Sequence, residues 1–190
     1  GGNNITYRIM QYLKILFSAY YRKQKVLNAY DIFQMDMAEV YGFVDEFGKD
    51  ALYKELEQKY IESESIIPTQ FAAYKQLDTE SYNKVRSNFY FLWNLAESIK
   101  LAFYENTGIT RTVFHQQGIK KNWKDTKIIA EQTWKLNVVL KNNILQLITD
   151  LPEIVINKEE IDLLLKGDIY SIVKKFVEPL YEQNLLQDYS

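Results

Sequence analysis

The sequence predicts an all-α fold, an irregular bundle of five to seven helices that begins with a long N-terminal helix. Three observations lead to this prediction. Turn residues are scarce, because the 190 residues include only 7 Gly and 3 Pro. Apolar side chains recur at three- and four-residue steps through long stretches, and the alternation of a half-buried strand is hard to find. Chains of this composition usually form long helices joined by short connections.

The apolar periodicity and the capping residues divide the chain into predicted helices. These are residues 5–47, residues 51–61 after an N-cap at Asp50, a helix from Asp78 or Thr79 to about Gly108, residues 120–149, a short helix capped by Asn157 and a last helix after Gly167. Residues 62–77 are expected to form a loop or a short helix, and residues 110–114 a short turn. The most strand-like run, residues 154–156, is too short to build a sheet alone.

The predicted helices belong to one domain. We interpret residues 1–4 as a cloning remnant and a polar lead-in, and residues 5–190 as a single helical domain. The core is expected to contain large apolar side chains from the middle of the longest predicted helices. These are Phe89, Leu92, Ile99, Trp134, Val138 and Ile148.

The composition excludes several classes of chemistry. With no Cys and one His, the chain has no disulfide framework and no thiol nucleophile, and an ordinary zinc site is not expected. No phosphate-binding glycine-rich loop, nucleophile elbow or zinc-protease motif is present. We therefore expect no metal, no cofactor and no catalytic residue, and the protein is predicted not to be an enzyme. The formal net charge of −2 gives no general attraction to duplex DNA.

Charge is distributed unevenly along the chain. Residues 1–30 contain five bases and no acid, whereas residues 150–190 contain four bases and nine acids. The basic N-terminal segment has two interpretations: a solvated face or docking edge for the acidic end, or a segment just inside a membrane. The predicted N-terminal helix does not itself span a membrane, because Arg8, Gln11 and Lys14 interrupt its apolar run. The second interpretation would place the protein in the cytoplasm at the inner face of a membrane, with a spanning segment before residue 3.

The densest polar cluster lies in residues 110–127. It combines bases with an imidazole and an indole, a set suited to an anionic, planar ligand. The predicted ligand-binding residues are Arg111, His115, Lys120, Lys121, Trp123 and Lys124. The alternative interpretation is a solvated loop with a packed tryptophan.

Aromatic residues are unusually frequent, with 15 Tyr and 10 Phe. Tyrosine suits surfaces that are partly buried and partly wet, which include oligomer interfaces and ligand clefts. The alternative is a thick aromatic core whose hydroxyl groups reach its edge. We expect self-association into a homo-oligomer through this tyrosine-rich surface.

One stretch resembles a known type of protein. The residues are Val85-Arg86-Ser87-Asn88-Phe89, Leu92-Trp93-Asn94-Leu95, Ile99-Lys100-Leu101-Ala102-Phe103, Ile109-Thr110, Phe114 and Trp123. They resemble a family of small bacterial proteins of unknown function, in which a membrane helix precedes a cytosolic all-helical domain. That arrangement is similar in kind to CRISPR-associated membrane effectors whose cytosolic domain binds cyclic tetra-adenylate. The resemblance implies a membrane-tethered domain in bacterial antiphage defence and carries over no ligand residue.

Together these observations predict a non-enzymatic sensor or adaptor domain that binds an anionic ligand such as a cyclic oligonucleotide. Binding would shift helix packing or oligomeric state and so pass a signal to the membrane anchor. A second hypothesis is a protein–protein interaction module of phage or mobile-element origin. A third is a small enzyme that uses carboxylate or His115 chemistry.

Overall fold

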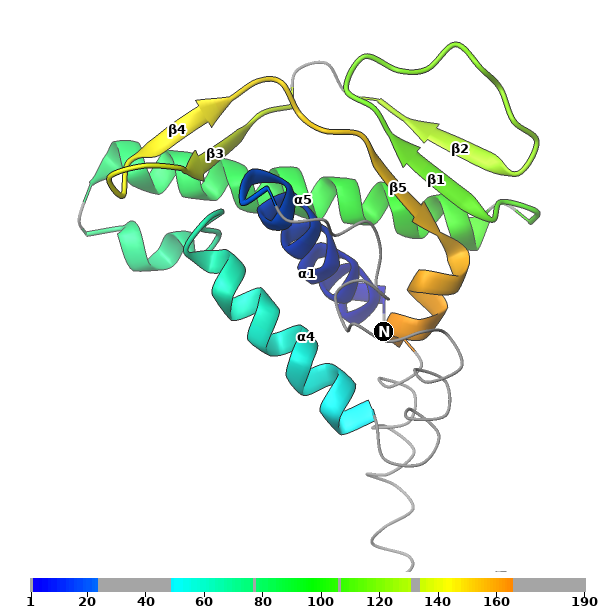
Figure 1. Cartoon of the computed structure of the whole chain (residues 1–190), viewed down its shortest axis with the longest axis horizontal. Helices are drawn as coiled ribbons and strands as arrows, with labels where there is room; N and C mark the ends of the chain where they lie inside the picture. The colour runs from blue at the N-terminus through cyan, green and yellow to red at the C-terminus, as the bar shows by residue number, and fades with distance from the viewer. Residues whose placement is uncertain (1, 24–48, 77, 106, 131–133, 166–190) are drawn as a thin grey trace, which may run out of the picture.

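Helices and strands are combined in the computed structural model, which describes residues 2–23, 49–76, 78–105, 107–130 and 134–165. The helices are α1 (Gly2–Tyr21), α4 (Lys49–Glu64), the 3₁₀ turn η2 (Phe71–Tyr74) and α5 (Thr79–Glu105). The strands are β1 (Arg111–Phe114), β2 (Thr126–Ile129), β3 (Leu136–Val139), β4 (Leu145–Ile148) and β5 (Ile154–Asn157). Residues 158–165 are helical and follow β5 directly. Figure 1 shows α1 between α4 and α5, with the strands along the upper edge.

The all-α prediction is wrong. The helix predicted over residues 120–149 is replaced by β2, β3 and β4, the turn predicted at 110–114 is β1, and the run at 154–156 is part of β5. Each of these strands has only four residues. So short a sequence does not distinguish the two-residue period of a strand from the 3.6-residue period of a helix. The pairing of β1 with β5 also joins residues that are distant in the sequence.

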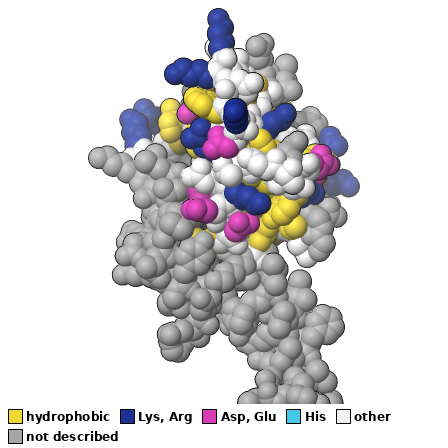
Figure 2. Space-filling model, turned by 90° about the vertical axis from the view of Figure 1, so that its right-hand side faces the viewer, with side chains coloured by type: hydrophobic (Ala, Val, Ile, Leu, Met, Phe, Trp, Pro, Cys, Tyr) yellow, Lys and Arg dark blue, Asp and Glu magenta, His cyan; other side chains and the backbone are white. Residues whose placement is uncertain are grey.

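The strands form two small sheets. In the first, with order β2-β1-β5, β1 pairs in parallel with β2 and antiparallel with β5. This sheet lies on the right-hand side of Figure 1, the side that faces the viewer in Figure 2. In the second, β3 and β4 form an antiparallel hairpin. Its turn places both Asn142 and Asn143 at φ 57° and closes with a hydrogen bond of 3.2 Å from the Ile144 N–H to the Lys141 carbonyl, as a type I′ turn requires.

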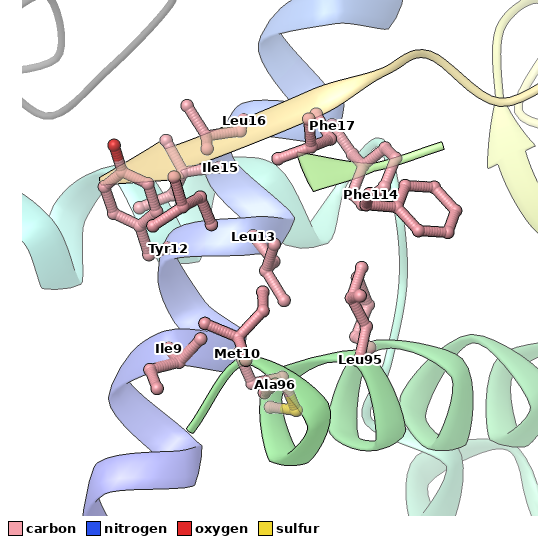
Figure 3. Close-up of a cluster of buried hydrophobic side chains, with 14 of the residues drawn as sticks. Ile9, Met10, Tyr12, Leu13, Ile15, Leu16, Phe17, Leu95, Ala96 and Phe114 are labelled. Carbon is pink, nitrogen blue, oxygen red and sulfur yellow. The ribbon is translucent and has the colours of Figure 1, made fainter. Parts of the chain in front are cut away.

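Helix α1 is buried on all sides over most of its length. Every residue from Ile9 to Ala19 is buried, so the helix carries no solvated face there, whereas the sequence predicted a single apolar stripe. Its apolar side chains meet α5 and β1 in the cluster that Figure 3 shows. The ring centre of Phe17 lies 5.8 Å from that of Phe91 and 6.3 Å from that of Phe114. The helical and sheet parts of the chain therefore share one core.

The predicted core is confirmed in part. Leu92, Ile99 and Val138 are almost fully buried. Phe89, Trp134 and Ile148 are only partly buried and pack against the edge of the core. Several aromatic side chains, such as Tyr12, Phe17 and Phe91, are part of this core, as the interpretation of a thick aromatic core expects.

Polar side chains on α1 bind the neighbouring elements. Lys14 is fully buried and pairs with Glu64 of α4, and its ammonium group also donates to Thr69 Oγ1 at 3.1 Å. Burial lowers the pKa of Lys14, and the hydrogen bond to Glu64 opposes this shift. Arg8 pairs with Glu57 of α4 at 3.1 Å. These two N-terminal bases therefore contact acids of the protein itself.

The C-terminal end of the helix predicted over residues 5–47 also differs from the structure. Helix α1 begins at Gly2 and ends at Tyr21. Residues 24–47 of the predicted helix lie outside the described residues. Arg22 and Lys23 are exposed just after α1. Among the described residues, no helix has the length and apolar character needed to cross a membrane.

A buried amide joins the hairpin to α5. The side chain of Asn88 donates to the Asn137 carbonyl at 2.8 Å and accepts from the Asn137 N–H at 2.8 Å, so it pairs with β3 as a strand would. Its NH₂ group also donates to the Pro68 carbonyl at 2.9 Å. Because an unpaired buried amide costs about 1–3 kcal/mol, this geometry fixes the position of β3 on α5.

Two of the three predicted caps are confirmed, since Asp78 and Asn157 each directly precede a helix. The N-cap predicted at Asp50 is wrong, because α4 already begins at Lys49. Asp78 accepts from the Glu80 N–H at 3.0 Å and from Ser81 Oγ at 2.8 Å, which caps α5. At the start of helix 158–165, Glu160 accepts from the Asn157 N–H at 2.7 Å. Glu160 also accepts from the Tyr12 hydroxyl of α1, so this cap connects the short helix to the core.

We expect Phe114→Ala to lower the free energy of unfolding by about 3–5 kcal/mol, because the change leaves a cavity where α1, α5 and β1 meet. Urea denaturation measures this loss. Leu101→Ala, on the exposed face of α5, should change the same quantity by no more than about 0.5 kcal/mol. A loss at Phe114 no larger than that at Leu101 would contradict the assignment of this core.

The two single substitutions that break the ion pair of Lys14 with Glu64 should lower the free energy of unfolding by different amounts. Glu64→Gln leaves the fully buried Lys14 charge uncompensated and should cost about 3–5 kcal/mol of unfolding free energy. Lys14→Met keeps the volume and removes the charge. Glu64 then keeps the Thr69 and Gln70 N–H groups as donors at 2.8 and 3.0 Å, so the cost should be within about 1 kcal/mol. Equal costs in urea denaturation would contradict this account.

Candidate ligand-binding site

One face of the three-stranded sheet is turned away from the core. Thr112 and Phe114 of β1 are buried in the core, so the alternate residues Arg111, Val113 and His115 share the opposite face. The antiparallel register pairs Val113 with Val155 of β5. Strand periodicity and register thus place side chains of two strands on this outer face.

A loop lies over this face because of the strand connection. β1 and β2 are parallel, so residues 115–125 must return the chain from the end of β1 to the level of its start. The loop begins with a tight turn, in which the Gly118 N–H donates to the His115 carbonyl at 2.9 Å and Gly118 has a φ of 77°. Glycine adopts this conformation without strain, so Gly118 sets the direction in which the loop leaves the sheet.

The loop and the sheet face line an open cavity of about 580 Å³. Its lining residues are Arg111, Val113, His115, Gly118, Ile119, Lys120, Lys121, Trp123, Glu153 and Val155. A volume of this size falls within the range of about 300–1,000 Å³ that is typical of small-molecule sites. The lining combines three bases and one acid with an apolar centre.

Arg111 connects the sheet to the end of the loop. Its guanidinium carbon lies 5.3 Å from the centre of the Trp123 ring, within the range of a cation–π contact. Its Nε donates to Thr126 Oγ1 at 3.1 Å. Both contacts orient the guanidinium group at the boundary between β1, β2 and the loop.

Asp125 holds the start of β2 beside the start of β1. Its carbonyl accepts from the N–H groups of Thr110 and Arg111 at 2.8 and 3.2 Å. Its carboxylate accepts from the hydroxyls of Thr126 and Thr110, both at 3.1 Å. These hydroxyl donors, that of Thr126 first, lower the pKa of the Asp125 carboxyl below its usual value.

His115 lines the cavity just after β1. Its backbone N–H donates to the Ile129 carbonyl at 3.0 Å, which fixes the residue beside β2. Its Nδ1 is buried, and no group of the described residues forms a hydrogen bond with it. Because the protein covers this nitrogen, it does not serve as a contact for a ligand in the cavity.

Five of the six predicted ligand-binding residues line this cavity. Lys124 is exposed and does not contribute to the lining. The sequence prediction missed the contributions of Glu153 and Val155, because they depend on β5 pairing with β1. The run of β-branched residues Ile154, Val155 and Ile156 was the sequence signal that could have indicated a strand here.

The basic side chains on this side of the molecule do not form one continuous surface. Figure 2 shows Lys and Arg side chains over the upper part of this side of the molecule, with acidic and apolar side chains between them. Such a distribution suits a small anion better than a long polyanion, which would need a continuous basic surface. Within the described ranges, no three His, Asp or Glu side chains come together as a metal site would require.

The chain matches no protein-family model, no curated protein and no solved structure. The resemblance to bacterial membrane-anchored helical domains therefore stays a prediction, and so does the role in antiphage defence. The cavity and its lining residues are the features that bear on function.

Asp125→Asn should reduce the amount by which the free energy of unfolding falls as the pH is lowered into the acid range. The folded-state pKa of Asp125 is depressed, so its stabilising contribution is present above the usual carboxyl pKa of 3.8 and is lost as the pH falls through the folded value. Urea denaturation between about pH 5 and pH 2 should show a steeper loss in the wild type than in the variant. Asp150→Asn removes an exposed carboxylate without these donors and serves as the control; equal slopes for the wild type and Asp125→Asn would contradict the proposed cause.

Proposed function

We propose that this protein is a non-enzymatic sensor that binds an anionic nucleotide between the outer face of the three-stranded sheet and the loop 115–125. The observation that carries the proposal is that three bases and an indole from this region line one cavity. A solvated loop, the alternative interpretation, would leave these side chains apart from one another.

The lining suits the parts of a nucleotide. The guanidinium of Arg111 and the ammonium groups of Lys120 and Lys121 provide donors for phosphate oxygens. Val113 and Val155 pair across β1 and β5 and give the cavity an apolar lining. Val155 is 36% exposed and Val113 only 4%, so a base would contact mainly Val155. Small-molecule sites commonly combine a mainly apolar lining with a few polar groups that fix the orientation of the ligand.

Binding could be converted into a signal through the loop. Six of the ten lining residues belong to the loop 115–125, and the other four belong to β1, β5 or the residue before β5. A ligand that contacts both would favour the loop positions in which both sets of contacts form. The loop position is therefore the part of the molecule that would differ between the free and bound states.

A membrane tether is part of the same proposal. Two of the five bases in residues 1–30, Arg8 and Lys14, are used in ion pairs with α4, whereas Arg22 and Lys23 are exposed. The exposed pair would be the contribution of this region to an anionic membrane surface, at about 1 kcal/mol for each base.

A protein–protein interaction module is the second candidate, and the β3–β4 hairpin supports it. Ile144 and Leu147 are 63% and 47% exposed, and Leu140 is also exposed, so the hairpin presents apolar side chains to solvent. Self-association through this hairpin would agree with the homo-oligomer expected from the sequence. This candidate does not require the cavity to bind a small molecule.

The test of the nucleotide proposal is binding by isothermal titration calorimetry and thermal shift, using the 5′-monophosphates of guanosine, adenosine, cytidine and uridine and cyclic tetra-adenylate. At least one should bind and, at 100 times its Kd, stabilise the protein by about 2.7 kcal/mol. Lys120→Glu combined with Lys121→Glu should abolish binding, because it replaces two bases of the cavity by acids. The circular dichroism spectrum should not change, since both side chains are exposed.

Lys135→Glu with Lys141→Glu provides the matched control, since it makes the same charge change at exposed positions outside the cavity. Its affinity should stay within about threefold of the wild type, as expected when exposed charges act at a distance through salt. Failure of the wild type to bind any of these probes would reject the sensor and favour the interaction module. Equal losses in the two double variants would reject the cavity as the binding site.

A further inference from the structure

Arg111 and Glu153 lie toward opposite ends of the sheet face that lines the cavity. Arg111 and His115 lie on the same face of one extended segment, four residues apart, which corresponds to about 13 Å. Arg111 and Trp123 are in contact and mark one end. Continuing the β1–β5 register by one residue beyond Phe114 and Ile154 places Glu153 opposite His115, at the other end. The apolar pair of Val113 and Val155 lies between the two ends.

Glu153 is an acid without a counter-charge. Its side chain is exposed and lines the cavity, yet within the described ranges no base forms an ion pair with it. A carboxylate would repel a phosphate bound beside it. At about 13 Å from the Arg111 position, however, it lies beyond the Debye length of about 8 Å at physiological salt. Glu153 and Arg111 can therefore contact two different parts of one ligand.

The end at Glu153 requires a ligand group that donates hydrogen bonds. An ionised carboxylate only accepts, and its two oxygens can accept from two adjacent donors. Guanine presents two adjacent donors, N1–H and the exocyclic amino group, along one edge. Adenine and cytosine present one amino group beside a ring acceptor, and uracil presents one N–H between two carbonyls that the carboxylate would repel.

We propose that the ligand of this cavity is a guanine nucleotide and that Glu153 is the residue that selects the base. The phosphate lies at the Arg111 end, the base lies against Val155, and the Glu153 carboxylate accepts from N1–H and the amino group. His115 lines the cavity at the same end as Glu153. This inference rests on the proposed nucleotide-binding function and adds the identity of the base.

The experiment is calorimetric titration of the wild type, Glu153→Gln and Glu159→Gln with the four nucleoside 5′-monophosphates. The wild type should bind guanosine monophosphate at least about tenfold more tightly than the other three, a ratio in the range expected when a site is built for donors that a competitor lacks. Glu153→Gln keeps the size of the side chain but replaces one acceptor oxygen with a donor. It should therefore lose this preference while its affinity for uridine monophosphate stays equal or increases.

Glu159→Gln removes the same charge from an exposed position outside the cavity and should keep the guanine preference. Wild-type binding without a guanine preference, or a preference that survives Glu153→Gln, would overturn the assignment of the base and leave the nucleotide site intact. Absence of binding by all four nucleotides and by cyclic tetra-adenylate would instead remove the nucleotide site, and the assignment of the base with it.

Discussion

The burial of α1 is the constraint on which the rest of the structure depends. A helix surrounded by protein on every side can keep its polar side chains only if each neighbour supplies a partner for them. Helix α4 supplies Glu57 and Glu64, and helix 158–165 supplies Glu160. These partners come from separate parts of the chain, so satisfying α1 fixes where both helices lie.

The same helix connects the helical part of the molecule to the sheet. Phe17 contacts Phe91 of α5 and Phe114 of β1, and Phe114 in turn stacks on Trp134 at 5.5 Å. The inner face of the sheet is thereby attached to the core, and its outer face is left for the loop 115–125. The cavity is thus supported by a rigid floor, which favours the precise placement of lining side chains.

Features that depend on neighbours in the sequence were predictable, and features that depend on distant pairing were not. The cap at Asp78 is local and agrees with the sequence. The bases of the cavity were also predictable, because the loop holds most of them in one short stretch. The strands were missed because β1 and β5 are separated by the whole hairpin, and Glu153 was missed for the same reason. The consecutive residues Asn142 and Asn143 were the local signal for a hairpin.

The division of β1 into two faces has a consequence for how this protein can change over time. Thr112 and Phe114 serve the interior, whereas Arg111, Val113 and His115 serve the cavity. In the proposed sensor, substitution of Arg111 or His115 would change the contacts made to a ligand and leave the core cluster as it is. Val113 is only 4% exposed, so it contributes to packing as well. Descendants of such a sensor would acquire new ligands by exchanging alternate residues of a single strand.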